Sequence, residues 1–108
     1  MVKNEIAYII NKFIRELNKE GIDIIKIFLF GSYARGTERI DSDIDVAVVC
    51  KDFDIDPIEQ NIKLWKIAVR VDTRIAPISF SLSEFQEDFI PIISEIKNGI
   101  DLTSEIAA

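Results

Sequence analysis

The chain has 108 residues, which suits one domain, and we expect residues 1–108 to share a single core. Its 19 acidic and 13 basic residues give a net charge of −6, which disfavours extensive nucleic-acid binding. One cysteine permits no internal disulfide and no apolar run reaches ~18 residues, so we expect a cytoplasmic protein with neither signal peptide nor membrane span. Histidine is absent, so catalysis would use carboxylates, hydroxyl groups or bound hard cations.

The N-terminal half of the chain predicts a helix followed by two strands. Apolar residues recur at helical spacing over residues 3–20, and Gly21 ends the pattern. Residues 24–30 are almost entirely apolar and predict a strand buried on both faces, after which a short helical turn begins at Ser32. A second strand is expected over residues 43–50, followed by an acidic loop.

The C-terminal half predicts a helix, a third strand and two further helices, over 57–69, 71–80, 83–89 and 91–99. Asp56 is the expected N-cap of the first of these helices, which carries apolar residues at helical spacing: Ile58, Ile62, Trp65 and Val69. Pro77 places the third strand at an edge or ends its pairing, and Ser83 with Gln86 predicts a capping box. The order of elements predicts an α/β (α+β) domain with a small mixed sheet flanked by helices.

The segment from Leu29 to Val49 carries the chemistry. A Gly31-Ser32 turn follows the first strand and offers backbone N–H groups and a hydroxyl at the start of a helical turn, where phosphate is attracted. The same dipeptide is also an ordinary loop element. Ten residues later Asp43 and Asp45 alternate along a strand, which points both carboxylates to one face about 7 Å apart.

Two carboxylates at the end of an apolar strand are costly unless they are compensated. A pair of Mg²⁺ ions bridging them to a triphosphate would compensate them and would stabilise an in-line phosphoryl displacement. The competing interpretation is a capped turn in which Asp45 pairs with Arg35 or Arg39. A second stretch with the same spacing, residues 52–56, lacks the preceding Gly-Ser turn and is interpreted as a solvated loop, so spacing alone does not define a site.

A third carboxylate is expected from the third strand. Asp72 lies between Val71 and Ile75, where a charged residue needs an explanation. On a regular strand Arg70 and Arg74 would share its face. Either the two arginines neutralise Asp72 in a structural ion pair, or all three residues belong to the site.

Together, Gly31-Ser32, a ten-residue spacer and Asp43-x-Asp45 resemble the signature of the DNA polymerase beta superfamily of nucleotidyltransferases. The longer pattern over residues 31–37 and 41–45 resembles most closely the minimal nucleotidyltransferase branch of that superfamily. Residues 70–75 resemble the strand that carries the third catalytic aspartate.

The resemblance implies a polymerase-beta-like nucleotidyltransferase fold that binds a nucleoside triphosphate, ATP in the leading hypothesis. It implies Gly31 and Ser32 at the phosphates and two Mg²⁺ ions held by the three aspartates Asp43, Asp45 and Asp72. An acceptor hydroxyl would attack the α-phosphorus and release pyrophosphate, with Asp72 helping to deprotonate it. Arg35 either contacts phosphate or only braces the loop.

Minimal nucleotidyltransferases of this kind often act as antitoxins that transfer AMP to a tyrosine of a partner ribonuclease toxin of the HEPN class. A HEPN active site needs histidine, so this chain is not that ribonuclease. The leading hypothesis is a metal-dependent protein adenylyltransferase with a HEPN partner. The alternatives are small-molecule nucleotidylation, as in aminoglycoside-modifying relatives, and a binding module that neutralises a partner by occlusion. Homo-oligomerisation is left open.

Overall fold

The computed structural model describes residues 3–51, 56–87 and 89–107. The helices are α1 (Asn4–Lys19), α2 (Ser32–Arg35), α3 (Pro57–Val71), α4 (Leu82–Phe85) and α5 (Pro91–Lys97). The strands are β1 (Ile24–Phe30), β2 (Ile44–Cys50), β3 (Ile75–Ser81) and β4 (Ile100–Asp101), and a 3-10 turn, Thr103–Ala107, follows them. The expected loop over residues 51–56 falls mostly outside the described residues.

The four strands form one mixed sheet in the order β3-β2-β1-β4. β1 is antiparallel to both β2 and β4, whereas β2 and β3 are parallel. Parallel neighbours need a long crossover connection, and α3 supplies it. The predicted α+β architecture with a small mixed sheet is therefore confirmed, and Pro77 lies on the edge strand β3, as expected.

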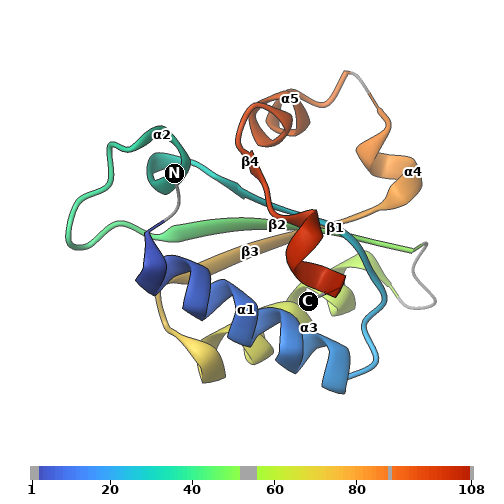
Figure 1. Cartoon of the computed structure of the whole chain (residues 1–108). Helices are drawn as coiled ribbons and strands as arrows, with labels where there is room; N and C mark the ends of the chain where they lie inside the picture. The colour runs from blue at the N-terminus through green and yellow to red at the C-terminus, as the bar shows by residue number, and fades with distance from the viewer. Residues whose placement is uncertain (1–2, 52–55, 88, 108) are drawn as a thin grey trace.

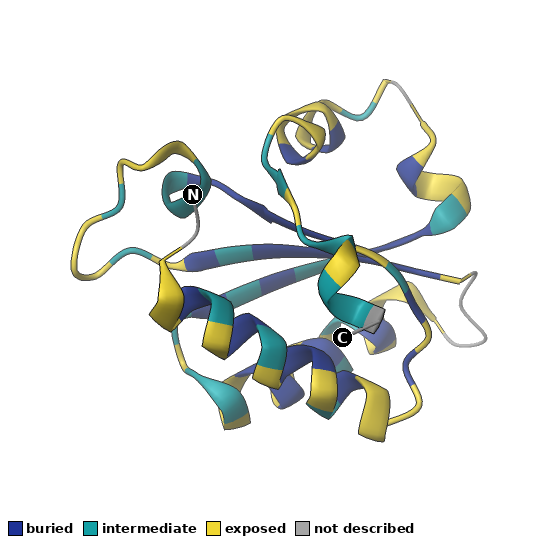
Figure 2. Ribbon diagram, in the orientation of Figure 1, coloured by how far each residue is buried: buried dark blue, intermediate teal, exposed yellow. Residues whose placement is uncertain are grey.

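The sheet has a helical layer on each face (Figure 1). α1 and α3 cover one face, on which Ile44, Val46 and Val48 of β2 are buried. α4 and α5 cover the other, where Ala47 and Val49 are buried with aromatic residues. Figure 2 shows the buried residues concentrated along the strands and the inner side of α1. Because side chains alternate along a strand, Asp45 belongs to the α4/α5 face of the sheet.

The predictions over residues 3–20, 24–30, 43–50 and 91–99 are confirmed to within two residues at each end. The start of the third strand is wrong: α3 continues to Val71, and β3 begins only at Ile75. Between them the Asp72 carboxylate accepts from the backbone N–H of Arg74 at 2.8 Å, which fixes a turn where an extended segment was expected.

The capping box of α4 is also displaced from its predicted position. Ser81 is the N-cap, its hydroxyl accepts from the Glu84 backbone N–H, and the Glu84 side chain bonds back to the Ser81 N–H. The predicted pair of Ser83 and Gln86 is therefore wrong, and the helix ends at Phe85. Both pairs match the same sequence pattern, and the structure forms the box at Ser81, which is buried at the end of β3.

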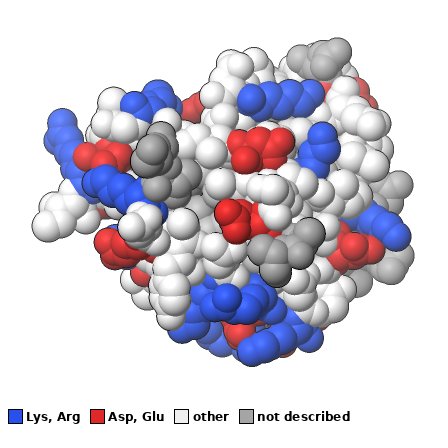
Figure 3. Space-filling model, in the orientation of Figure 1, with Lys and Arg blue, Asp and Glu red and all other residues white. Residues whose placement is uncertain are grey.

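The net negative charge is not spread evenly over the molecule. On the face that Figure 3 shows, Lys and Arg side chains gather along the lower edge, over the layer of α1 and α3. Within the described part of the chain, no helix is long and apolar enough to cross a membrane.

Candidate active site

The end of β1 lies directly against the start of β2. Phe30 is the register partner of Asp45, so the next residue, Gly31, turns over the Asp45 side chain. Gly31 has φ 73° and ψ −152°, a conformation that only glycine adopts readily. A Cβ on Gly31 would lie 3.0 Å from the Asp45 Cγ and would collide with Oδ2. Two independent reasons therefore favour glycine at position 31. They are its backbone conformation and the Asp45 carboxylate that occupies the space of a Cβ.

Asp45 is half-buried and lies among like charges. Burial is the main cause that raises the pKa of its carboxyl group, and the negative charges of Asp43 and Glu95 raise it further, while Arg35 opposes them. Asp43, exposed and immediately before β2, is thus close enough to act on Asp45. The structure brings these two predicted site residues together, in a place that a cation would stabilise.

The short helix α2 begins at this carboxylate. Gly31 is its N-cap and Ser32 its first residue, and the Gly31 carbonyl accepts from the N–H groups of Ala34 and Arg35 at 3.2 and 3.1 Å. The two predicted phosphate-binding residues therefore stand at the start of a helix and next to Asp45. This arrangement combines donors for an anion with an acidic pair that would repel the anion unless a cation lies between them.

A pocket of about 420 Å³ opens between α2 and α5, within the size range of small-molecule sites. Its lining residues come from the two helices and the turns beside them: Gly31, Ala34, Arg35, Pro91, Ser94, Glu95, Asn98 and Gly99. Across it, Arg35 Nη1 lies 3.4 Å from Glu95 Oε1, and both side chains are more than half exposed. Arg35 therefore reaches across the pocket toward α5 with its guanidinium exposed, and its contact with phosphate stays a prediction.

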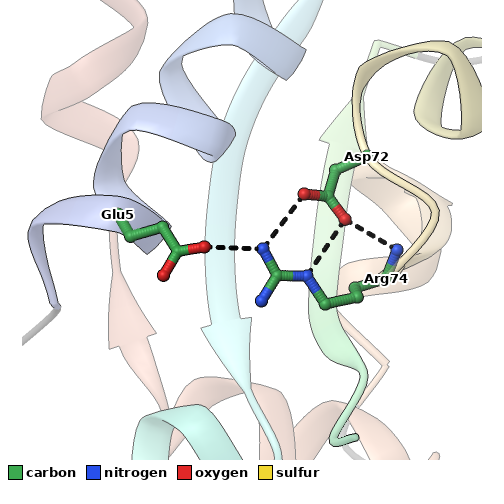
Figure 4. Close-up of polar contacts among 3 residues, drawn as sticks. All are labelled: Glu5, Asp72 and Arg74. Atoms are coloured by element: carbon green, nitrogen blue, oxygen red, sulfur yellow. Dashed lines mark hydrogen bonds and ion pairs between the residues drawn. The ribbon is translucent and has the colours of Figure 1, made fainter. Parts of the chain in front are cut away.

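Asp72 does not join Asp43 and Asp45. Its carboxylate accepts two bonds of 3.1 Å from the Arg74 guanidinium, which lowers the pKa of Asp72, and the same guanidinium contacts Glu5 of α1 at 2.9 Å (Figure 4). Asp72 is thus held in an ion-pair network on the α1 side of the sheet, whereas Asp45 faces α5. Arg70 lies in α3 and shares no strand face with them. The ion-pair interpretation describes this arrangement, and the catalytic role of Asp72 stays a prediction.

The position beside Asp45 on β3 is occupied by Ala76. The two residues are register partners in the parallel pair β2–β3, so their side chains leave the sheet on the same face. A third carboxylate contributed by β3 to this pair would have to stand at this position. Because this position is an alanine, the carboxylates near the site are those of Asp43 and Asp45, with Glu95 across the pocket.

The donors present fit one hard cation better than two. Within residues 3–51, 56–87 and 89–107, no group of three or more Asp, Glu, Cys or His side chains could hold a metal ion. Asp43 and Asp45 offer the oxygen ligands that Mg²⁺ prefers, and phosphate oxygens commonly complete its coordination. Among the described residues a second ion would have no further carboxylate in such a group, so the predicted pair of Mg²⁺ ions stays a prediction.

Glu95 was missed by the sequence analysis. It lies on the exposed side of α5, a helix recognised by Ile93 and Ile96, which are buried. No spacing in the sequence connects it with residues 31–45, because only the fold places α5 across the pocket from α2. Its approach to Arg35 and Asp45 could be found only from the structure.

The chain matches the family described as "Nucleotidyltransferase domain" over residues 8–101. It belongs to this family. The matched region contains both Gly31-Ser32 and the Asp43/Asp45 pair, and the predicted nucleotidyltransferase fold is confirmed.

Three known proteins show how far the likeness extends. The protein adenylyltransferase MntA of Shewanella oneidensis is 39% identical over 61 residues, which cover 56% of this chain and 40% of MntA, so the match spans less than half of that relative. A Sulfolobus solfataricus structure described as a proposed nucleotidyltransferase superposes with a TM-score of 0.61 at 18% identity, covers 74% and 70% of the two chains, and supports the fold alone. A toxin-antitoxin crystal structure with AMP-PNP superposes with a TM-score of 0.51 at 36% identity. The superposed region covers 64% of this chain and 55% of the matched chain.

Replacing Asp45 by Asn should raise the thermal midpoint of unfolding in metal-free buffer near neutral pH. The pKa of Asp45 is raised on folding, so the ionised carboxylate destabilises the folded state at a pH above that pKa, and the penalty disappears as the pH falls through it. We expect the gap between Asp45→Asn and wild type to close toward about pH 4, as followed by circular dichroism.

The control for this prediction is Asp41→Asn, which removes one charge from an exposed position outside the acidic pair. It should leave the midpoint close to that of the wild type. A lower midpoint for Asp45→Asn at neutral pH would show that the carboxylate has a stabilising partner, and the proposed charge repulsion would then be wrong.

Proposed function

We propose that this chain is a Mg²⁺-dependent nucleotidyltransferase that transfers AMP from ATP to a hydroxyl group of a partner toxin, most simply a tyrosine of a HEPN protein, and so acts as its antitoxin. The single observation that carries the proposal is the apposition of Gly31 and Asp45 beside the pocket between α2 and α5. Membership in the nucleotidyltransferase family supports the reaction class. The similarity to MntA and to a toxin-antitoxin complex supports the kind of acceptor.

In this proposal the N–H groups at Gly31 and Ser32 bind phosphate oxygens, and Arg35 at the pocket wall adds a positive charge. Asp43 and Asp45 would hold Mg²⁺, which would supply positive charge to offset the phosphates and orient the triphosphate. The acceptor oxygen forms a bond to the α-phosphorus, the bond from that phosphorus to the bridging oxygen breaks, and pyrophosphate leaves. The proton of the acceptor hydroxyl passes to a base, a role for which this chain has no histidine.

A label-transfer assay tests the proposed reaction. The chain is incubated with Mg²⁺, ATP labelled at the α-phosphate and a HEPN protein encoded by a neighbouring gene, and we expect the label on the HEPN protein. The double variant Asp43→Asn, Asp45→Asn should lower the rate of label transfer at least about 100-fold, because it removes both proposed metal ligands. Transfer that survives this double substitution would contradict the proposal.

The chain offers a matched control in its second Asp-x-Asp stretch. Asp52→Asn combined with Asp54→Asn removes the same two charges at the same spacing and should leave the label transfer intact. Asp72→Asn separates the two interpretations of that residue. A loss as deep as that of the Asp43/Asp45 variant would assign Asp72 a catalytic role, and a small loss would leave it in the ion pair with Arg74.

A second candidate function is neutralisation of the toxin by occlusion, with the site retained for nucleotide binding. Ala76 favours it, because the register leaves Asp45 without a carboxylate neighbour on β3. Under occlusion, a variant with Asp43, Asp45 and Asp72 all replaced by Asn still neutralises the toxin. Under the enzymatic proposal that variant fails to do so.

Ala76→Asp tests whether the missing carboxylate limits the site. The new side chain would leave the sheet beside Asp45, so we expect tighter Mg²⁺ binding by calorimetry, by about tenfold, and faster label transfer. Thr73→Asp is the control, because it adds the same charge at an exposed position before β3. Equal Mg²⁺ affinity in the two variants would show that position 76 is not part of the metal site.

A further inference from the structure

A stripe of large apolar side chains runs along the outer side of α3. Its members, which we call the α3 stripe, are Ile58, Ile62, Trp65 and Val69, with exposed fractions of 70%, 50%, 46% and 53%. At 3.6 residues per turn they fall within about 60° of one another around the helix axis. These residues identified the helix in the sequence, yet they do not form its buried side.

The core of the protein uses the opposite side of α3. The buried residues of the helix are Gln60, Leu64, Ile67 and Ala68, which pack toward the sheet and α1. Single exposed apolar residues are normal on a protein surface. Four on one line, over three turns and opposite the core, form a continuous apolar surface of the kind that marks an interface.

Charged side chains flank the α3 stripe in an asymmetric order. Glu59 lies on one flank near the start of the helix, and Lys66 and Arg70 lie on the same flank toward its end, all three exposed. None of them takes part in an ion pair within the described part of the chain. Lys63, deeper on this flank, donates instead to the Glu20 carbonyl at 3.3 Å.

The charges on this flank would pair with those of a second copy of α3 if the two helices ran antiparallel. A two-fold axis crossing the stripe midway between Ile62 and Trp65 brings each of these residues opposite the other in a second copy. The same rotation keeps the charged flanks together and sets Glu59 of one copy against Lys66 and Arg70 of the other. A parallel two-fold arrangement would instead put the charged flanks of the two copies on opposite sides of the contact, where Glu59 could not meet Lys66 or Arg70.

We propose that the α3 stripe is a two-fold dimer contact, and that its occupant is α3 of a second copy of this chain. Because the proposed contact is formed by one helix of each copy, we expect it to be small and the dimer to dissociate on dilution. It lies on the α1/α3 layer, whereas Asp45 and the pocket beside α5 belong to the other face of the sheet. Dimerisation therefore leaves the proposed active site open, and the two proposals fail or hold independently.

Dilution experiments on the full chain test the proposed dimer. Analytical ultracentrifugation should show a monomer-dimer equilibrium, and emission from Trp65, the only tryptophan, should shift to the red as the dimer dissociates. Ile62→Glu should weaken association at least about tenfold while circular dichroism shows the fold retained. Tyr8→Glu, at a 63% exposed position on α1, is the matched control and should leave association unchanged.

A charge-exchange experiment tests the antiparallel geometry. Glu59→Arg alone and Arg70→Glu alone should each weaken the dimer, because each sets like charges against one another. Mixing these two variants should restore association, because both contacts are then between opposite charges.

Three results would overturn the proposal. They are a wild-type chain that stays monomeric at every concentration, an Ile62→Glu variant that associates like the wild type, and a mixture of the charge variants no more associated than either alone. A Trp65 shift produced only by lipid vesicles or by a toxin, with the chain monomeric, would assign the stripe to another occupant and would equally overturn it.

Discussion

The close approach of Gly31 to Asp45 is the constraint on which the rest of the site depends. Antiparallel pairing of β1 and β2 sets Phe30 opposite Asp45, so the chain must leave β1 directly over a carboxylate, and only a residue without a Cβ fits there. The result is a helix start that offers anion-binding N–H groups next to an acidic pair. Phosphate alone would be repelled from this place, and a cation held by Asp43 and Asp45 would have an incomplete set of ligands, so we expect the two to bind together.

The sequence predicted the parts of the molecule that local patterns determine. The composition of residues 24–30 and of the Gly31-Ser32 turn predicts the structure that they adopt. After the ten-residue spacer the chain returns along β2, which sets Asp45 against Gly31. The third strand failed because the side chain of Asp72 bonds its own neighbouring backbone and forms a turn, which an apolar and β-branched composition does not reveal. Glu95 could not be found at all, since only the packing of α5 on the sheet brings it across the pocket from Arg35.

The separation of Asp72 from the acidic pair changes what the chain can do alone. Its charge is balanced by Arg74, and Arg74 is in turn held by Glu5, so this network ties the turn before β3 to α1. With Ala76 beside Asp45, β3 brings no carboxylate to the site. In an adenylyl transfer, the acceptor protein would then supply more of the groups that position the hydroxyl and accept its proton than this chain does.

The most direct test of this account is Mg²⁺-dependent binding of a non-hydrolysable ATP analogue to Gly31→Ala and Gly36→Ala, measured by calorimetry. Both glycines have positive φ, 73° and 74°, but Gly36 has ψ 21°, in the left-handed helical region, whereas Gly31 has ψ −152°. Gly36→Ala therefore controls for a positive φ alone, and of the two positions only 31 would bring its Cβ against the Asp45 carboxylate. The account predicts that Gly31→Ala loses binding and that Gly36→Ala keeps it. Equal affinities in the two variants would contradict the claim that the contact between Gly31 and Asp45 builds the site.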